Sequence, residues 1–123
     1  MKITLLGMEH LRLEDAAGPL TIEAESVEMQ YSPFHMVASG LATCIFALLH
    51  SWAEHAGLKA DDLAIEVRWT FAEKPHRVGS YDVRLQWPEL PDARRQAATR
   101  AASLCAVHAT LTHAPAIAVE VLQ

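Results

Sequence analysis

Cys44 and Cys105, the two cysteines of this chain, are the residues whose chemistry is most distinctive. A cysteine thiolate is a nucleophile, and two thiols that meet can form a disulfide. The neighbours of Cys44 one helical turn away are small or apolar, namely Gly40, Leu41, Ala47 and Leu48. Such surroundings raise the pKa of a thiol, and Cys44 is too far from the start of its helix to gain from the helix dipole. The spacing alone therefore favours a buried structural cysteine, and a reactive Cys44 would need a cation that only tertiary structure could bring.

Cys105 has similar surroundings, with small residues on both sides and His108 three positions further on. The simplest interpretation is a core cysteine beside a histidine. Cys44, Cys105 and His108 could in principle hold zinc together with His35. However, the chain has no Cys-x-x-Cys or His-Glu-x-x-His motif. We therefore expect no metal and no other cofactor.

The elements that must position these cysteines follow from the hydrophobic pattern. Alternation predicts strands over residues 1–13, 20–25, 63–71, 81–87 and 116–122, with the second pairing back onto the first. A helix is predicted over 91–104, and 105–112 either continues it or starts a short second helix. The long helix that carries Cys44 begins with Ser32 as N-cap and Pro33 as its first residue, and it stops at Gly57. This order predicts one α+β domain over residues 1–123, with a mainly antiparallel sheet whose apolar face packs on the helices.

The long helix is apolar on nearly every side in its first four turns. A helix of this kind must be buried on every side, and a chain of 123 residues has little material with which to do that. We therefore expect a homodimer with this helix at its centre. Its clean apolar run, residues 36–49, is 14 residues long, which is too short to span a bilayer.

The composition excludes several classes of partner. The chain is 51% hydrophobic and 20% charged, so it can build a core. Its net charge is −5, which argues against nucleic acid and anionic membrane surfaces as main partners. The first residues contain no long apolar stretch of the kind found in secretory signals. We expect a cytoplasmic protein whose cysteines are reduced at rest.

Two motifs resemble those of the OsmC/Ohr family. The first runs from Ser32-Pro33-Phe34-His35-Met36 to Ala42-Thr43-Cys44, and it resembles the family's Ser-Pro-x-Glu-Leu helix start followed by a cysteine. The second is Leu104-Cys105-Ala106-Val107-His108 through Leu111, which resembles the pattern Cys-Pro-Val-x-x-x-Leu. Both occur in the expected order with the expected elements between them. Ala106 stands where the second pattern has proline.

This resemblance implies an intertwined homodimer that reduces organic hydroperoxides with thiols and without metal or haem. It implies that Cys44 is the attacking thiolate, Cys105 the resolving thiol, and an external dithiol the reductant. The family pattern has a glutamate where this chain has His35, and that glutamate orients an activating arginine. Arg12, the only arginine before the helix, is the matching candidate. The alternatives are that Arg12 is an exposed surface arginine and that His35 only caps the helix. The alternative is a non-catalytic dimeric member of the fold that binds an apolar small molecule or senses redox state.

Overall fold

The computed structural model describes residues 1–123, and its centre is the long helix α1 (Pro33–Ala56). The Ser32 Oγ accepts a hydrogen bond from the His35 N–H at 3.2 Å, and Pro33 fixes the first turn. Gly57 ends the helix in the left-handed conformation, with φ of 69°, which a residue without a Cβ adopts at little cost. The predicted start and end of this helix are confirmed.

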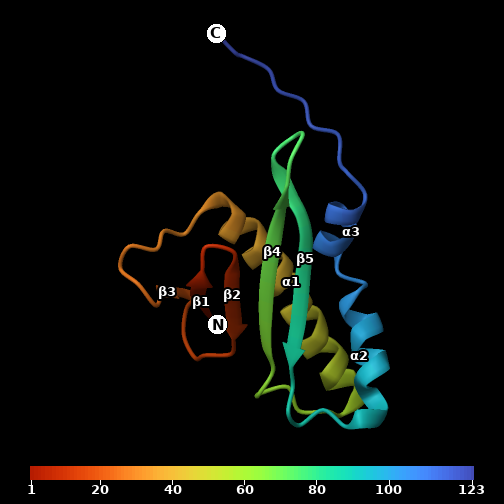
Figure 1. Ribbon diagram of the computed structural model, residues 1–123. Coiled ribbons are helices and arrows are strands. Elements are labelled where there is room, and N and C mark those ends of the chain that lie inside the picture. Colours follow the sequence, from red (N-terminus) through yellow and green to blue (C-terminus); the bar gives the residue numbers. More distant parts are fainter.

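Five strands form one mixed sheet in the order β3-β1-β2-β4-β5 (Figure 1). Their bounds are β1 Lys2–Gly7, β2 His10–Glu14, β3 Thr21–Ala24, β4 Ala64–Ala72 and β5 Arg77–Gln86. Three of the four pairings are antiparallel, and β3 pairs with β1 in parallel. The single strand predicted over residues 1–13 is divided by a turn at residues 8–9, because β1 folds back onto β2. The α+β fold with a mainly antiparallel sheet is confirmed.

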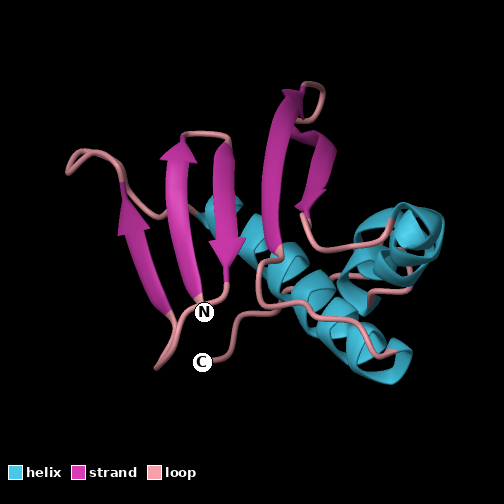
Figure 2. Cartoon of the chain, turned by 90° about the horizontal axis from the view of Figure 1, so that it is seen from below, coloured by secondary structure: helices cyan, strands magenta, loops and turns pink.

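The core lies between α1 and the middle strands of this sheet (Figure 2). Alternate residues of β1, β2 and β4 point toward the helix and are fully buried, among them Ile3, Leu5, Leu11, Leu13, Ile65, Val67 and Trp69. By length and composition alone α1 could cross a membrane. One side of it packs on the sheet, as in a core helix, while Met36, Ala47 and Ser51 remain exposed. The sheet therefore covers only one side of an apolar helix.

The C-terminal part contains two short helices, which is one of the two alternatives that the sequence predicted. A 3₁₀ turn (Asp92–Arg94) leads into α2 (Arg95–Ala102), and α3 (Ala106–Thr112) begins after a break at residues 103–105. Both helices contact α1. The strand predicted over 116–122 is wrong for the single chain, because this segment runs away from the sheet and finds no strand edge to pair with (Figure 1). Its apolar residues Ile117, Val119 and Val121 are more than 80% exposed.

Candidate functional site

The structure brings Cys44 and Cys105 together where α3 begins beside α1. Cys44 lies on the side of α1 away from the sheet and is half-buried, whereas Cys105 is 1% exposed. Cys105 is the N-cap residue of α3, and its Sγ accepts a hydrogen bond from the peptide N–H of His108 at 3.4 Å. The fold thus brings together two residues that the sequence places 61 positions apart, and each shifts the pKa of the other.

The hydrogen bonds around Cys44 favour its thiolate. Burial raises the pKa of this thiol, but hydrogen bonds from the Cys105 side chain and from the peptide N–H groups of Val107 and Ala106 outweigh it and lower the pKa overall. The expectation that apolar surroundings would leave Cys44 with a raised pKa is therefore wrong. That expectation took into account only the neighbours of Cys44 on α1. The groups that lower its pKa belong to Cys105 and to the start of α3.

Cys105 is shifted in the opposite direction. Burial raises its pKa, and both the hydrogen bond to Cys44 and the negative charge of the Cys44 thiolate raise it further. The peptide N–H groups of His108 and Val107 act against this rise and do not cancel it. Cys44 is thus the more acidic thiol of the pair and Cys105 the less acidic one.

His35 lies at the start of α1 and is completely buried, with hydrogen bonds on both ring nitrogens. Its Nδ1 accepts from the Ser32 N–H at 3.2 Å, and its Nε2 donates to the Gly7 carbonyl oxygen at 2.9 Å. These partners define a neutral ring with the proton on Nε2. The ring also packs edge-on against Trp69, with centroids 5.1 Å apart. His35 therefore joins the helix start to the turn between β1 and β2, and neither of its nitrogens is free to bind a metal or an arginine.

Arg12 lies on the face of the sheet opposite to α1. Its neighbours Leu11 and Leu13 point into the core, so strand alternation turns the guanidinium outward. There it donates to Glu66 at 3.1 Å and to Gln86. Within one chain the structure does not bring Arg12 or His35 to the Cys44 sulfur, and no cation contributes to the shift of the Cys44 pKa.

The comparisons with known proteins agree with this fold. The sequence model of the family described as OsmC-like protein matches residues 23–120, which include both cysteines. The chain belongs to the OsmC-like family. A search of curated proteins finds no match.

Two solved structures share the OsmC-like fold of this chain. One is described as an osmotic stress induced and detoxification response protein from Psychrobacter arcticus 273-4, with a TM-score of 0.62 and 18% identity over 88% of this chain and 84% of that one. The other is an OsmC-like hydroperoxide resistance protein from Jannaschia sp. CCS1, with a TM-score of 0.56 and 24% identity over 76% of this chain and 67% of that one.

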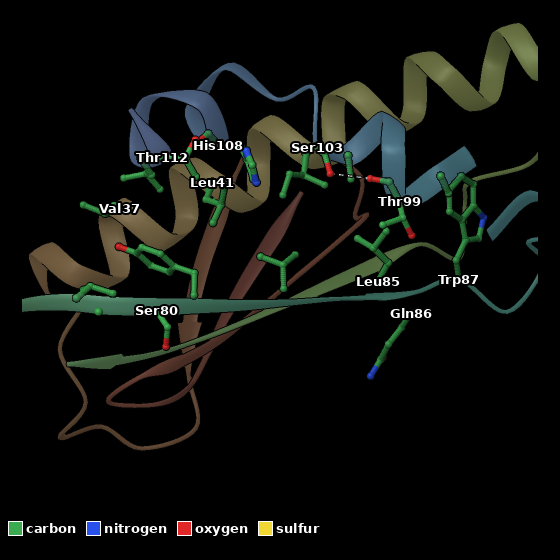
Figure 3. Close-up of a pocket in the computed structure, with 18 of the residues that line it drawn as sticks. Val37, Leu41, Ser80, Leu85, Gln86, Trp87, Thr99, Ser103, His108 and Thr112 are labelled. Carbon is green, nitrogen blue, oxygen red and sulfur yellow. Dashed lines mark hydrogen bonds between the residues drawn. The ribbon is translucent and has the colours of Figure 1, made fainter. Parts of the chain in front are cut away.

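A large groove in this OsmC-like chain lies next to the cysteine pair. It has a volume of about 1390 Å³ and runs between α1, β5 and the two C-terminal helices. Val37 and Leu41 of α1, Leu85 of β5 and His108 of α3 point into it (Figure 3). Neither cysteine lines this groove, and no Asp or Glu does, whereas two arginines and two histidines do.

Sequence reasoning missed the peptide groups of Ala106 and Val107 in this OsmC-like site. A backbone N–H leaves no trace in the residue type, so no motif search finds it. The one available signal was the alternative that residues 105–112 start a short second helix. That alternative is correct, and it makes Cys105 an N-cap with free N–H groups just after it. No group of three or more His, Cys, Asp and Glu side chains is arranged to hold a metal ion.

Proposed function

We propose that this chain reduces organic hydroperoxides, with Cys44 as the attacking thiolate and Cys105 as the resolving thiol. The observation that carries the proposal is that the two cysteines meet at the contact between α1 and α3 and that their pKa values are shifted in opposite directions. The lowered pKa of Cys44 provides the nucleophile, and the raised pKa of Cys105 keeps its proton for a later step. Membership of the OsmC-like family supports this assignment.

The chemistry proceeds in two steps that balance without a metal. The Cys44 thiolate attacks one oxygen of the hydroperoxide, the O–O bond breaks, and the departing alkoxide takes a proton to become an alcohol. Cys44 is then a sulfenic acid. The Cys105 thiol condenses with it, forms the S–S bond and releases water. An external dithiol then reduces this disulfide by thiol–disulfide exchange and restores both thiols.

The test is consumption of cumene hydroperoxide by the purified chain with dithiothreitol as reductant. Cys44→Ser must abolish consumption. Cys105→Ser must retain the first attack and accumulate sulfenic acid, which a dimedone-type probe traps. One equivalent of peroxide without reductant should remove both titratable thiols of the wild-type chain and lower its mass by about 2 Da. A wild-type rate equal to that of the Cys44→Ser variant would disprove the proposal.

We further propose that the active form is a homodimer. The side of α1 away from the sheet carries the exposed Met36 and Ala47 and the half-buried Gly40, a row of apolar and small residues that leaves room for a second helix. The segment 116–122 keeps its alternating pattern but has no strand edge of its own to pair with. Both features leave apolar surface in water, and a second copy of the chain offers matching surfaces for both.

The groove favours a second candidate function, which is binding of a small apolar molecule without catalysis. Its volume of about 1390 Å³ exceeds that of many small-molecule sites, and its charged groups are all basic. An apolar molecule with an acidic group would suit it. Thiol titration separates the two functions, because a binding protein would keep both thiols after exposure to peroxide.

A further inference from the structure

The strand β5 forms a free edge of the sheet. It is the last strand in the order β3-β1-β2-β4-β5 and pairs with β4 alone. Backbone N–H and C=O groups on its other side therefore point away from the sheet, and an edge of this kind accepts a further strand. The groove of about 1390 Å³ runs along this edge from Arg77 to Gln86, with α2 and α3 as its far wall (Figure 2). The ten residues of β5 extend over about 33 Å.

The inner face of β5 is also incompletely covered. Its inward side chains Tyr81, Val83 and Leu85 are only half-buried and line the groove. On the neighbouring strand β4, by contrast, Ile65 and Val67 are completely buried under α1. A further apolar strand beside β5 would cover these side chains and pair with the free edge at the same time.

Residues 116–122 have the properties of such a strand. Ile117, Val119 and Val121 alternate with Ala118 and Glu120, and these three apolar side chains are more than 80% exposed. A strand buries alternate side chains on one face, so all three would turn toward the groove together. Seven extended residues span about 23 Å, which fits within the length of β5.

The charges of this segment and of the groove are complementary. Glu120 is the only charged residue in 116–122, and the groove contains Arg77 and Arg95 but no Asp or Glu. The Arg77 guanidinium donates to the carbonyl oxygens of Glu73 and Pro75 and has no carboxylate partner within the chain. An extended segment with one glutamate is therefore attracted to this edge.

We propose that this groove is the docking site for residues 116–122 of a second copy of the chain, which add a sixth strand to the free edge of β5. The inference rests on the homodimer of the proposed function and names the surfaces that join it. Within one chain the segment leaves the end of α3 and runs away from β5 (Figure 1). A two-fold axis lets each copy give its segment to the other, so that both edges are paired at once. A groove filled in this way has no room for the small apolar ligand of the second candidate function.

Chains with a single cysteine each test which copy supplies the strand. The background is Cys44→Ser with Cys105→Ser, so that no native thiol competes. One chain carries Ala118→Cys, and the other carries a cysteine at one of three exposed positions on the outer face of β5, namely Ser80→Cys, Asp82→Cys or Arg84→Cys. The two chains are unfolded and refolded together with a mild oxidant. Paired residues on one face of a sheet have Cβ atoms about 5 Å apart, which is close enough for a disulfide after small adjustments.

We expect a cross-linked dimer on a non-reducing gel from at least one of these three pairs. Arg68→Cys is the matched control, because it is exposed on the same face but lies one strand further in, on β4, and it should not cross-link to Ala118→Cys. No cross-link from any of the three pairs would overturn the inference. So would a chain that carries both cysteines of a reactive pair and closes the disulfide within itself, because its own segment would then be the added strand.

Val119→Asp gives an independent test, with Ala118→Asp as its matched control. The first change places a charge in the apolar contact, and the second places the same charge on the outer face. Val119 is 90% exposed in the single chain, so neither change should disturb folding. Burial of one valine is worth about tenfold in affinity, and the dimer contains two such contacts, so Val119→Asp should raise the dissociation constant about a hundredfold.

Sedimentation measures this dissociation constant, and the apolar anionic dye anilinonaphthalene sulfonate reports whether the groove is covered. Dye fluorescence should be low in the wild type and in Ala118→Asp and higher in Val119→Asp. Equal dissociation constants for the two variants would overturn the inference. A wild-type dimer that binds the dye as strongly as Val119→Asp would also overturn it, because its groove would be open.

Because these measurements use no peroxide, failure of this inference and failure of the proposed function are distinguishable. The expected cross-link in a protein that consumes no hydroperoxide would refute only the peroxidase. Hydroperoxide consumption that needs Cys44, by a dimer that Val119→Asp and Ala118→Asp leave equally stable, would refute only the docking of residues 116–122.

Discussion

His35 provides the sharpest test of how this fold is held together. The change is His35→Ala, at a side chain that is completely buried. It removes the hydrogen bond to the Gly7 carbonyl and the one from the Ser32 N–H, and it leaves both backbone groups without a partner. It also removes the edge-on contact with Trp69 and opens a cavity.

The magnitude follows from these losses. Two hydrogen bonds contribute about 1 kcal/mol each, and the aromatic contact about 1 kcal/mol. The cavity adds a further cost, because large-to-small changes in a packed core usually cost about 2–5 kcal/mol in total. We expect the free energy of unfolding to fall by about 3–5 kcal/mol, most of the margin of many small domains.

The assay is urea unfolding followed by circular dichroism, in which the midpoint should fall while the slope is unchanged. His50→Ala is a matched control on the same helix. The His50 ring packs against Phe46 in a tilted arrangement with centroids 4.3 Å apart, but its Nε2 has no hydrogen-bond partner. Its loss should therefore cost only about 1 kcal/mol. If His35→Ala is no more destabilising than His50→Ala, the structural role assigned to His35 is wrong.

Two further predictions concern the outer face of the sheet and the proposed dimer. Burial raises the pKa of Glu66, but hydrogen bonds from His10 and Arg12 and their charges lower it overall. A carboxyl whose pKa is lower in the folded chain than in the unfolded chain stabilises the fold at pH values above its ordinary pKa. This stabilisation is lost as the pH falls through the pKa of the folded chain. The urea midpoint of Glu66→Gln should therefore decline less than that of the wild type between about pH 5 and pH 3. The wild type should sediment as a dimer and Ala47→Arg as a monomer. Arg84→Glu, an exposed change on the face of β5 opposite to α1, should remain dimeric. Equal acid profiles for wild type and Glu66→Gln, or a wild-type monomer at micromolar concentration, would contradict these predictions.

Local signals in the sequence were sufficient for the main elements. Ser32, Pro33 and Gly57 determine where α1 begins and ends through contacts within a few residues, so a reader of the sequence can place them. The strand β4 is recognisable for the same reason, since its alternation does not depend on its neighbours. The parallel pairing of β3 with β1 could not be predicted, because it depends on how the chain after residue 14 turns back across the sheet.

The site depends more on tertiary contacts. The cysteine pair was found through the two motifs, but the cause of the low Cys44 pKa lies in the docking of α3 onto α1. Arg12 was predicted either as the activating arginine that the resemblance implies or as a surface arginine. Within one chain, strand alternation turns it to the outer face with Glu66. His35 was predicted either as the counterpart of the family's glutamate or as a helix-capping histidine, and the structure shows it capping α1 and joining it to the first hairpin.

The order of the sheet has a consequence for how the chain folds as it is made. The pairing of β2 with β4 joins residues such as His10 and Arg68, with the whole of α1 between them. When β1, β2 and β3 leave the ribosome, Leu11 and Leu13 have no helix to pack on until α1 follows. The free edge of β2 must wait longer, until β4 has been synthesised as far as residue 72. Pairings over such separations form slowly, and chains in that interval are prone to associate with one another. The N-terminal hairpin is therefore the segment that should most need protection by a chaperone during synthesis.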